Sequence, residues 1–425
     1  MSSPAESLPR GLASGWSTLD RFLRERTCEK LDGLRGGQLR LHDELGERQL
    51  GDAASDGRDA LRATLRVHDP AFYRALAGNG SVGAGESFVD GEWDCDDLVA
   101  LVRLLVRNRD LLDSMETGMA RLGGLAMRAL HAARRNTRTG SRRNISAHYD
   151  LGNEFFQLFL DEGLMYSSAV FASPADTLEQ ASERKLRRIC EKLDLKSSDH
   201  LLEIGTGWGG MAIFAAREFG CRVTTTTISG RQHALASERV RAAGLTDRVT
   251  LLRRDYRDLD GRFDKLVSIE MVEAVGHQFL DGYFAKCARL LAPGGLALVQ
   301  AITIEDHRYA KALRSVDFIK RYIFPGSFIP CASVLAESAA RAGRLRLLNL
   351  EDFGDSYALT IRHWRQRFEA HREQARALGL DERFLRLWEF YLCYCEGGFL
   401  EHAISDVQLL LAAPGNQRTQ YLPGI

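Results

Sequence analysis

Short apolar runs and helix-spaced segments alternate through the second half of the chain. Runs typical of buried strands occupy residues 200–204, 222–228, 247–253, 263–270 and 296–303. Apolar positions three and four apart, the spacing of an amphipathic helix, occur at residues 209–220, 230–244 and 279–291, and APGG at 292–295 is typical of a turn. Strands that alternate with helices predict an α/β fold with a parallel sheet.

The N-terminal residues follow a different pattern. Residues 38–50 and 59–69 alternate apolar and polar side chains as half-buried strands do, and residues 96–115 have helical spacing. A chain of 425 residues is long enough for two or three domains. The change of pattern predicts three parts: an N-terminal domain at 1–116, a linker at 117–145 and a larger domain at 146–425.

The composition is that of a globular protein without the bulk charge that attracts nucleic acid, with 27% charged residues and a net charge of zero. The eight cysteines are scattered, except Cys393 and Cys395, so we expect reduced thiols and no metal site. The first residues lack the apolar core of a signal peptide, and no apolar run reaches the roughly 18 residues of a membrane span. We therefore expect a cytoplasmic protein that meets a membrane only from the side.

The predicted linker is strongly basic. Residues 121–143 contain seven arginines and no acid, with apolar residues between the first of them. Two interpretations are open. The segment is either a solvated linker or a contact with anionic phospholipid, where each basic residue contributes about 1 kcal/mol.

A glycine-rich turn follows the first predicted strand of the larger domain. In LLEIGTGWGG, Glu203 can accept from the amino-acid part of a cationic ligand, and Gly205 and Gly207 let the backbone approach that ligand closely. The next strand ends in TTTTISGRQ and lacks the acid that binds ribose in dinucleotide folds, which favours S-adenosylmethionine. After the third strand, Asp255 can accept from an adenine amino group and Tyr256 can stack on the ring. The alternative for these two is a structural acid and a core aromatic.

The chain resembles the cyclopropane fatty acid synthase family, which includes mycolic acid methyltransferases, nearly from end to end. Similar stretches include ISAHYDLGNEFFQLFLDEGLMYSS, LEIGTGWGG, FDKLVSIEMVEAVG and DFGDSYALTIRHW, with VHDPAFYRALAGNGSVGAGESFVDGEW in the smaller domain. The resemblance implies a Rossmann-like class I methyltransferase domain with a mostly parallel seven-stranded sheet, and an N-terminal α+β lipid-binding domain. It also implies a homodimer, peripheral at the inner membrane face. Its reaction would be the transfer of a methyl carbon from S-adenosylmethionine to the double bond of an unsaturated phospholipid acyl chain.

Residue by residue, the resemblance places the cofactor at Tyr166, Ser167, Gly205, Gly207, Thr227, Ile228, Gln232, Asp255 and Tyr256. The family also holds a bicarbonate ion that takes the proton, and three of its holders match here: Glu273, Tyr357 and the backbone of Ile302. Two holders do not match, since Ser168 replaces a cysteine and Gln300 replaces a histidine. Neither side chain can supply the charge of an imidazolium, so the product stays open between a cyclopropane and a methyl or methylene branch.

The implied reaction explains why an acid follows an apolar strand in VSIEMVEAVGH. An alkene that attacks a sulfonium methyl leaves a carbocation, which requires a dry site with aromatic faces. The aromatic candidates, for each of which the alternative is a simple core residue, are Phe155, Phe156, Phe159, Tyr322, Phe324, Phe328, Tyr391 and Phe399.

Two acids follow that strand. Glu273 is the candidate that orients the base and stabilises the cation, and the alternative is that it caps the helix near His277. Glu270 is expected to face the cofactor or a backbone amide. Two other functions stay open: a methyltransferase of this fold acting on a soluble small molecule, and a lipid-binding protein without catalysis.

Overall fold

The structure is a computed structural model of the chain, and it describes residues 15–52, 60–113 and 152–418. The chain divides into two compact units, Met1–Gly123 and Gly124–Ile425. The arginine-rich segment at 121–143 lies outside the described residues. Its assignment as a linker, and the domain limits at 116 and 146, therefore stay predictions.

The first unit is a four-stranded sheet with helices. The strand order is β2-β1-β3-β4, in which β1 and β3 are parallel and the other pairs are antiparallel. Every second side chain of β1 and β3 is buried, as the sequence alternation predicts. The elements are α1 (Thr18–Leu31), β1 (Gly37–Asp43), β2 (Gly46–Leu50), β3 (Leu61–Val67), α2 (Ala71–Val89), β4 (Trp93–Cys95), α3 (Leu98–Arg107) and α4 (Arg109–Asp113).

The helix predicted at residues 96–115 is divided in the structure. Asn108 lies between α3 and α4, and its side-chain amide donates to the backbone oxygens of Leu104 at 2.8 Å and Arg35 at 2.9 Å. An asparagine that binds backbone groups competes with helical hydrogen bonding, which accounts for the break.

The second unit is built on a seven-stranded sheet with the order β10-β11-β9-β8-β5-β6-β7. The strands from β9 to β7 pair in parallel, and β10 and β11 add an antiparallel edge. The prediction of an α/β fold with a mostly parallel seven-stranded sheet is confirmed. The strands are β5 (His200–Ile204), β6 (Arg222–Thr227), β7 (Val249–Arg253), β8 (Phe263–Ile269), β9 (Leu291–Ile304), β10 (Arg346–Asp352) and β11 (Ile404–Ala412).

The turn predicted at residues 292–295 is wrong. These residues lie within β9, whose register against β8 shifts between Phe263 and Lys265. Gly294 has a φ of +75°, so the glycine makes an irregular start to the strand instead of a separate turn.

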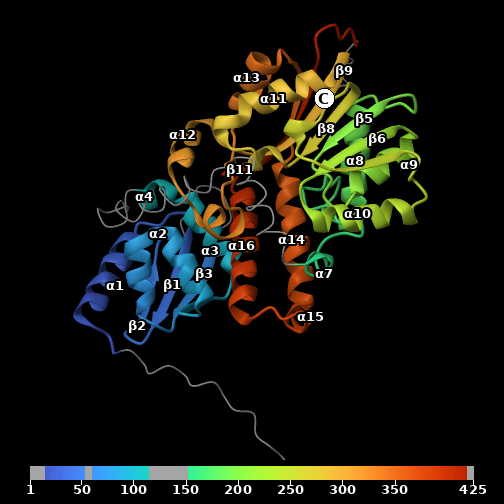
Figure 1. Ribbon diagram of the computed structural model, residues 1–425. Helices are drawn as coiled ribbons and strands as arrows, with labels where there is room; N and C mark the ends of the chain where they lie inside the picture. The colour runs from blue at the N-terminus through green and yellow to red at the C-terminus, as the bar shows by residue number, and fades with distance from the viewer. Residues whose placement is uncertain (1–14, 53–59, 114–151, 419–425) are drawn as a thin grey trace, which may run out of the picture. The chain divides into compact units, whose positions relative to one another are not determined.

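Helices cover both faces of this sheet (Figure 1). In β11, Val407 and Leu409 pack with α11 and α13 on one face, while Leu410 and Ala412 pack with α8 and α9 on the other. The α-helices are α7 (Asn153–Gln157), α8 (Leu178–Lys192), α9 (Gly210–Phe219), α10 (Gly230–Ala242), α11 (Leu280–Leu290), α12 (Asp306–Arg314), α13 (Ala332–Gly343), α14 (Gly354–Ala370), α15 (Arg372–Ala377) and α16 (Glu382–Leu400). Short 3₁₀ segments lie at η1 (Tyr256–Asp258), η2 (Val272–Ala274) and η3 (His277–Phe279), and a π-helical turn at η4 (Ile319–Ile323).

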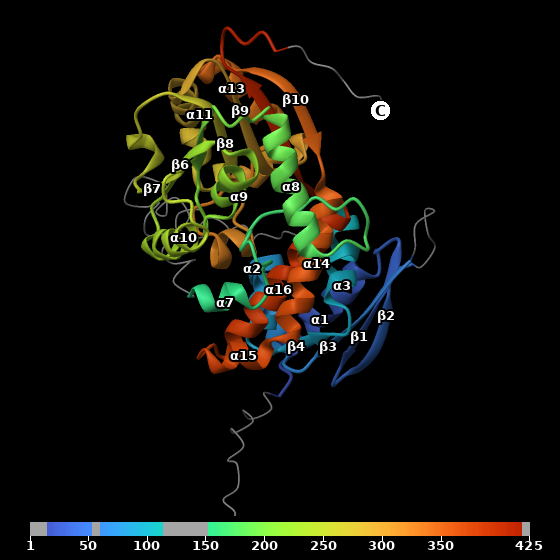
Figure 2. The same ribbon diagram turned by 90° about the vertical axis from the view of Figure 1, so that its right-hand side faces the viewer.

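A separate apolar core forms where α14 and α16 run side by side (Figures 1 and 2). Its rings contact one another edge to face and in tilted pairs, for example Phe155 with Trp388 at 4.9 Å between centroids. We call it the aromatic cluster; its buried rings are Phe155, Phe156, Phe159, Trp208, Tyr357, Trp364, Phe368, Trp388, Tyr391 and Phe399.

Candidate active site

The glycine-rich turn after β5 has the backbone that the sequence predicts. Gly205 and Gly207 have φ angles of +103° and +52°, where glycine is strongly favoured. The Gly205 amide donates to the Thr226 carbonyl at 3.1 Å, which fixes the turn to β6. A Cβ atom on Gly207 would meet no atom within 4 Å. Within the described residues, the turn therefore opens onto free space that a side chain would fill.

Glu203 is buried at the end of β5 and is held by the neighbouring strand. Thr225, its direct partner in the parallel register, donates from Oγ1 to Glu203 Oε2 at 2.6 Å. Burial raises the pKa of Glu203 to about 8, although the hydroxyl of Thr225 and the charge of Lys185 act in the opposite direction. This carboxyl supports the turn; its contact with a ligand stays a prediction.

The predicted residues after β6 form one hydrogen-bonded group. Thr227, the last residue of β6, donates from Oγ1 to Gln232 Oε1 at 2.8 Å. The Ser229 hydroxyl caps α10 by accepting from the backbone N–H of Gln232. Ile228 lies between Thr227 and Ser229 in the chain. Gln232 is thereby fixed, with its carboxamide nitrogen unused by these bonds.

Asp255 already has a cationic partner, which the sequence interpretation did not include. Arg257 donates to it in bidentate fashion, from Nε to Oδ1 at 2.9 Å and from Nη2 to Oδ2 at 2.7 Å. The Arg257 backbone amide also donates to Oδ1 at 3.0 Å, and a carboxylate offers more lone pairs than these three bonds use, so an adenine amino group can still be accepted. Tyr256 packs edge to face on Tyr283 at 5.6 Å, and its stacking on a ligand stays a prediction.

Tyr166 and Ser167 lie between α7 and α8. The Tyr166 hydroxyl is 3.0 Å from the Tyr391 hydroxyl, and Tyr166 packs against the aromatic cluster. Ser167 Oγ accepts from the Lys185 ammonium at 2.7 Å. Lys185 is fully buried, and burial lowers its pKa, while four carboxyl groups oppose that effect. Sequence reasoning missed this lysine because helical spacing alone marks its position on α8 as an ordinary polar residue.

Glu273 has one occupied and one unoccupied carboxylate oxygen. Its Oε1 accepts from the Ile302 amide at 2.6 Å, so two of the predicted bicarbonate holders are bonded to each other. Its Oε2 is buried and has no hydrogen-bond partner among the described residues. Burial and the nearby Glu270 raise the pKa of Glu273 to about 8. The alternative of a helix cap is wrong, because neither η3 nor α11 has a side-chain cap.

Glu270 is the residue on which the other predicted holders converge. It accepts from the Ser168 amide at 2.8 Å, from Gln300 Nε2 at 2.9 Å and from the Tyr357 hydroxyl at 2.6 Å. The expectation that Glu270 faces a backbone amide is confirmed. Its φ of +46° is costly for a glutamate, and such strain is typical of functional sites.

Asp406 is a second residue that sequence reasoning missed. It is fully buried in β11, and its Oδ2 accepts from Gln300 Nε2 at 2.9 Å. Burial, followed by the charge of Glu270, raises the pKa of Asp406 well above its ordinary value. Three carboxyl groups, Glu270, Glu273 and Asp406, therefore share one small region. Only the pairing of β11 with β9 brings the third one there, so local motifs could not reveal it.

Most of the aromatic candidates fall in one place. Five belong to the buried aromatic cluster, and Phe324 packs against it. The other two lie elsewhere: Phe328 packs in the core with residues of α11 and α13, as its alternative of a core aromatic allows, and Tyr322 is 36% exposed.

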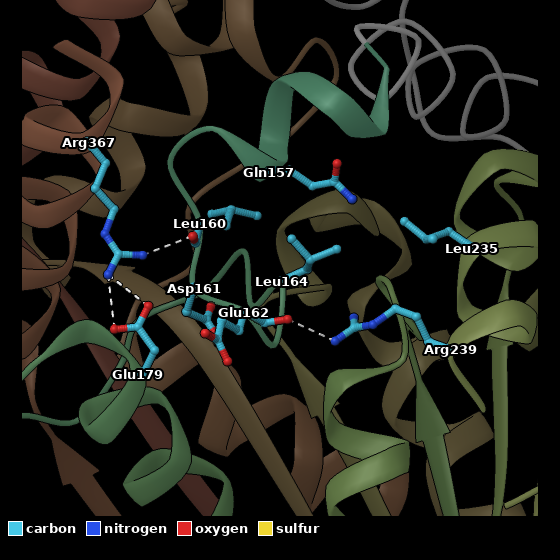
Figure 3. A pocket seen from close by; sticks show the side chains of 9 residues that line it. All are labelled: Gln157, Leu160, Asp161, Glu162, Leu164, Glu179, Leu235, Arg239 and Arg367. Atoms are coloured by element: carbon cyan, nitrogen blue, oxygen red, sulfur yellow. Dashed lines mark hydrogen bonds and ion pairs between the residues drawn. The ribbon is translucent and has the colours of Figure 1, made fainter. Parts of the chain in front are cut away.

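The second unit also contains a cavity of about 460 Å³, and none of the predicted site residues lines it (Figure 3). Gln157 of α7 and Leu235 of α10 point into it from opposite sides. Its arginines are engaged: Arg367 binds the Leu160 oxygen and the Glu179 carboxylate, and Arg239 binds backbone oxygens, including that of Glu162. Because its arginines are engaged and no predicted site residue lines it, this cavity is not assigned to the predicted chemistry.

Comparison with known proteins gives the family. The model of the family described as mycolic acid cyclopropane synthetase matches residues 136–409, which is more than half of the chain. The chain belongs to this family. It is 36% identical to the tuberculostearic acid methyltransferase of Mycobacterium tuberculosis over 381 residues, covering 85% of this chain and 86% of that protein. It is also 36% identical to the cyclopropane-fatty-acyl-phospholipid synthase of Escherichia coli over 350 residues, covering 82% of this chain and 86% of that protein.

Solved structures agree with this family. The cyclopropane synthase MmaA2 from Mycobacterium tuberculosis matches with a TM-score of 0.60 and 28% identity, covering 64% of this chain and 98% of that one. A mycolic acid cyclopropane synthase complexed with SAH, the demethylated cofactor, matches with a TM-score of 0.60 and 29% identity, covering 64% of this chain and 98% of that one. This chain is therefore an S-adenosylmethionine-dependent lipid methyltransferase with a class I fold.

The strand ends of this methyltransferase fit S-adenosylmethionine. The turn at Gly207 opens onto free space, β6 ends in a threonine and not in a ribose-binding acid, and Asp255 follows β7. We expect Gly205 and Gly207 to approach the ligand with their backbone, and Asp255 and Gln232 to hydrogen-bond it. When bound, the cofactor supplies an electrophilic methyl group.

Proposed function

We propose that this methyltransferase adds a methyl carbon to the double bond of an unsaturated fatty acyl chain carried by a membrane phospholipid. The observation that carries the proposal is the Glu273 carboxyl, which lies beside Glu270 and keeps one buried oxygen without a partner among the described residues. A buried carboxyl oxygen with no partner is costly, and a cationic intermediate or a bound anion would satisfy it.

The aromatic cluster supports an acyl substrate. Its rings are apolar and largely buried, and Tyr357 belongs to the cluster while it donates to Glu270. Aromatic faces stabilise positive charge and exclude water, which would otherwise trap a carbocation. In this proposal the cluster shields the reacting carbons, and the carboxyl groups of Glu270 and Glu273 lie at their edge.

We further propose that a bicarbonate ion at Glu273 takes the proton. An anion beside two carboxyl groups is tolerable only if one of them is protonated, and the raised pKa of Glu273, about 8, supports that form. A protonated Glu273 can donate from Oε2, whereas the Ser168 amide and Gln300 Nε2 already donate to Glu270, so the ion would share these donors with Glu270. The Tyr357 hydroxyl donates a hydrogen bond to Glu270, so its oxygen can still accept one from the ion.

The product class depends on where the proton leaves. Loss from the added methyl closes a cyclopropane ring, and loss from a neighbouring chain carbon leaves a methylene branch. The relatives named above include a tuberculostearic acid methyltransferase and a cyclopropane synthase at the same 36% identity, so identity does not separate the two products.

Expression in a bacterial host that lacks such enzymes, with methyl-labelled methionine, tests the proposed reaction. We expect the label in fatty acids released from phospholipids, as a cyclopropane or a branch identified by mass spectrometry. Cells carrying Glu273→Gln serve as the control. Purified protein that labels soluble fatty acids without vesicles would instead support the small-molecule alternative. Tight cofactor binding with no labelled product in either assay would support the non-catalytic one.

We also propose that the N-terminal unit and the arginine-rich segment bring a homodimer to an anionic membrane surface on the cytoplasmic side. Among the described residues, no helix is long and apolar enough to cross a membrane. Neutralising Arg134, Arg135, Arg142 and Arg143 should weaken co-sedimentation with anionic vesicles and make the remaining binding less sensitive to salt. Unchanged co-sedimentation at low salt would leave the segment as a linker only.

A further inference from the structure

A row of polar side chains crosses the sheet beneath α8, where apolar residues are expected. Gln300 of β9 and Gln408 of β11 are direct partners in the antiparallel register, and both are fully buried. Lys192, at the end of α8, donates from Nζ to Gln408 Oε1 at 2.8 Å. Gln408 Nε2 donates to Gln300 Oε1 at 3.1 Å. Gln300 Nε2 in turn donates to Glu270 and to Asp406, each at 2.9 Å.

The direction of this row is fixed from both of its ends. A lysine ammonium can only donate, so Gln408 must present its oxygen to Lys192 and its nitrogen to Gln300. At the other end, Gln300 faces two carboxyl groups, and its nitrogen is the only part that donates to both. The two requirements agree, because each glutamine then uses its oxygen on the lysine side and its nitrogen on the carboxyl side. A flip of either amide would set oxygen against oxygen inside the sheet.

We propose that Lys192 and Gln408 are positioning residues, which hold Gln300 as a double donor and thereby keep Glu270 and Asp406 together at the base site. The proposal rests on the proposed function of this site in lipid methylation. A change at Lys192 or Gln408 would affect the predicted reaction residues by displacing Glu270. Because Glu270 also accepts from the Ser168 amide and the Tyr357 hydroxyl, a displaced Glu270 would misplace both groups.

Asp406 shows why such a double donor is needed. It lies beside Glu270 and accepts one hydrogen bond on Oδ2, while its Oδ1 is buried without a partner among the described residues. Two neighbouring carboxyl groups repel each other when both are ionised, and a shared amide donor reduces that repulsion. The other charged groups that act on Asp406 are Glu273, after β8, and Lys185, from α8.

The outer end of the row is tied to an ion pair. Glu351 of β10 accepts from both Lys192 and Arg188, and the Lys192 side chain is 14% exposed. Glu351 therefore restrains the lysine so that one of its protons stays on Gln408. Arg188 shares Glu351 but is not in contact with the glutamines, which makes it a matched control.

Two replacements of Gln408 test the direction of the row with little change in side-chain size. In Gln408→Glu, the new carboxylate pairs with Lys192 and can only accept. Gln300 must then turn its nitrogen toward it and its oxygen toward Glu270 and Asp406. Gln408→Met removes the contacts without reversing them. With vesicles and labelled S-adenosylmethionine, we expect kcat to fall about 100-fold for the first variant and about tenfold for the second, with the cofactor KM unchanged within about twofold.

Variants at the outer end keep the test decisive if Gln408→Glu does not fold. Lys192→Met should lower kcat severalfold at constant cofactor KM, and Arg188→Met should leave kcat unchanged. Equal kcat values for the two Gln408 variants, or wild-type kcat in Lys192→Met, would overturn the proposal. Wild-type protein that fails to methylate phospholipid in the same assay would overturn the proposed function instead, so the two failures are distinguishable.

Discussion

The acids at the ends of two neighbouring strands, β5 and β8, are held by different kinds of hydrogen-bond partner. Glu203, at the end of β5, takes its hydrogen bond from its register partner on β6, Thr225. Glu270, just after β8, takes its bonds from Ser168, Gln300 and Tyr357, which are 102, 30 and 87 residues away in sequence. The first arrangement needs only a correct sheet. The second needs the whole unit folded, and it leaves Glu273 Oε2 beside it without a partner among the described residues.

The difference indicates a division of labour. The end of β5 shapes the turn at which the cofactor is predicted to bind, and Glu203 is held there by Thr225. The end of β8 gathers carboxyl groups whose charge matters when the substrate becomes cationic. Substitutions in the turn after β5 should therefore change cofactor affinity, and substitutions after β8 should change kcat.

Glu273→Gln should give the largest effect. The amide keeps the size of the side chain and can accept from Ile302, but it cannot carry negative charge toward a cation or orient a base. We expect kcat to fall about 1000-fold, on the order of 4 kcal/mol, with cofactor affinity within about twofold of wild type. Calorimetry for affinity and vesicle assays for rate measure the two quantities. A variant that retains more than a tenth of the wild-type rate would remove Glu273 from the chemistry.

Gly207→Val should produce the converse result. Valine is strained at a φ of +52°, and its side chain would fill the space onto which the turn opens. We expect cofactor affinity to fall about 100-fold while the fold is retained. Gly282→Val is the control, because a Cβ atom on Gly282 of α11 would also meet no atom within 4 Å, while the φ of this glycine is an ordinary helical one. Equal affinity in both variants would show that the cofactor does not approach the turn at Gly207.

The sequence could predict the parts of this protein that depend on local spacing. The five strands β5 to β9, the helices α9, α10 and α11, the glycine turn and the acid after β7 follow from residues close together in the chain, whereas β10 and β11 were not predicted from spacing. Asp406, Gln408 and Lys185 could not be found in this way. Each is a single polar residue outside the segments whose spacing was interpretable, and only long-range contacts show that it is buried beside Gln300 or Ser167. The division of the helix at Asn108 was missed for the same reason, since its partner Arg35 lies 73 residues away.

A smaller effect is expected on the pH dependence of the free energy of unfolding, to which Glu203 and Glu273 both contribute. Burial raises the pKa of both Glu203 and Glu273 to about 8 from an ordinary 4.5, so the folded, cofactor-free protein holds these protons more tightly than the unfolded chain. The contribution of these two carboxyl groups to stability should be greatest below about pH 4.5, and it should be lost as the pH rises to about 8. Glu203→Gln and Glu273→Gln should each make that fall shallower in denaturant unfolding between about pH 5 and 9. Only the second should abolish turnover. A fall as steep as in wild type for both variants would show that neither carboxyl is protonated in the folded protein.

The smallest effect is expected at Asp255, where one carboxylate serves both a structural partner and the predicted ligand. Asp255→Ala should weaken cofactor binding about tenfold, the value of one charge-assisted hydrogen bond. Arg257→Ala provides the comparison, because it removes the bidentate donor and leaves the carboxylate in place. If Asp255 accepts from the adenine amino group, Arg257→Ala should change affinity by less than about twofold, since the ligand contact survives. If instead the ion pair only shapes the segment after β7, the two variants should lose affinity equally. Calorimetric titration of both proteins with S-adenosylmethionine therefore decides whether the end of β7 reads the adenine directly or only supports the strand ends that do.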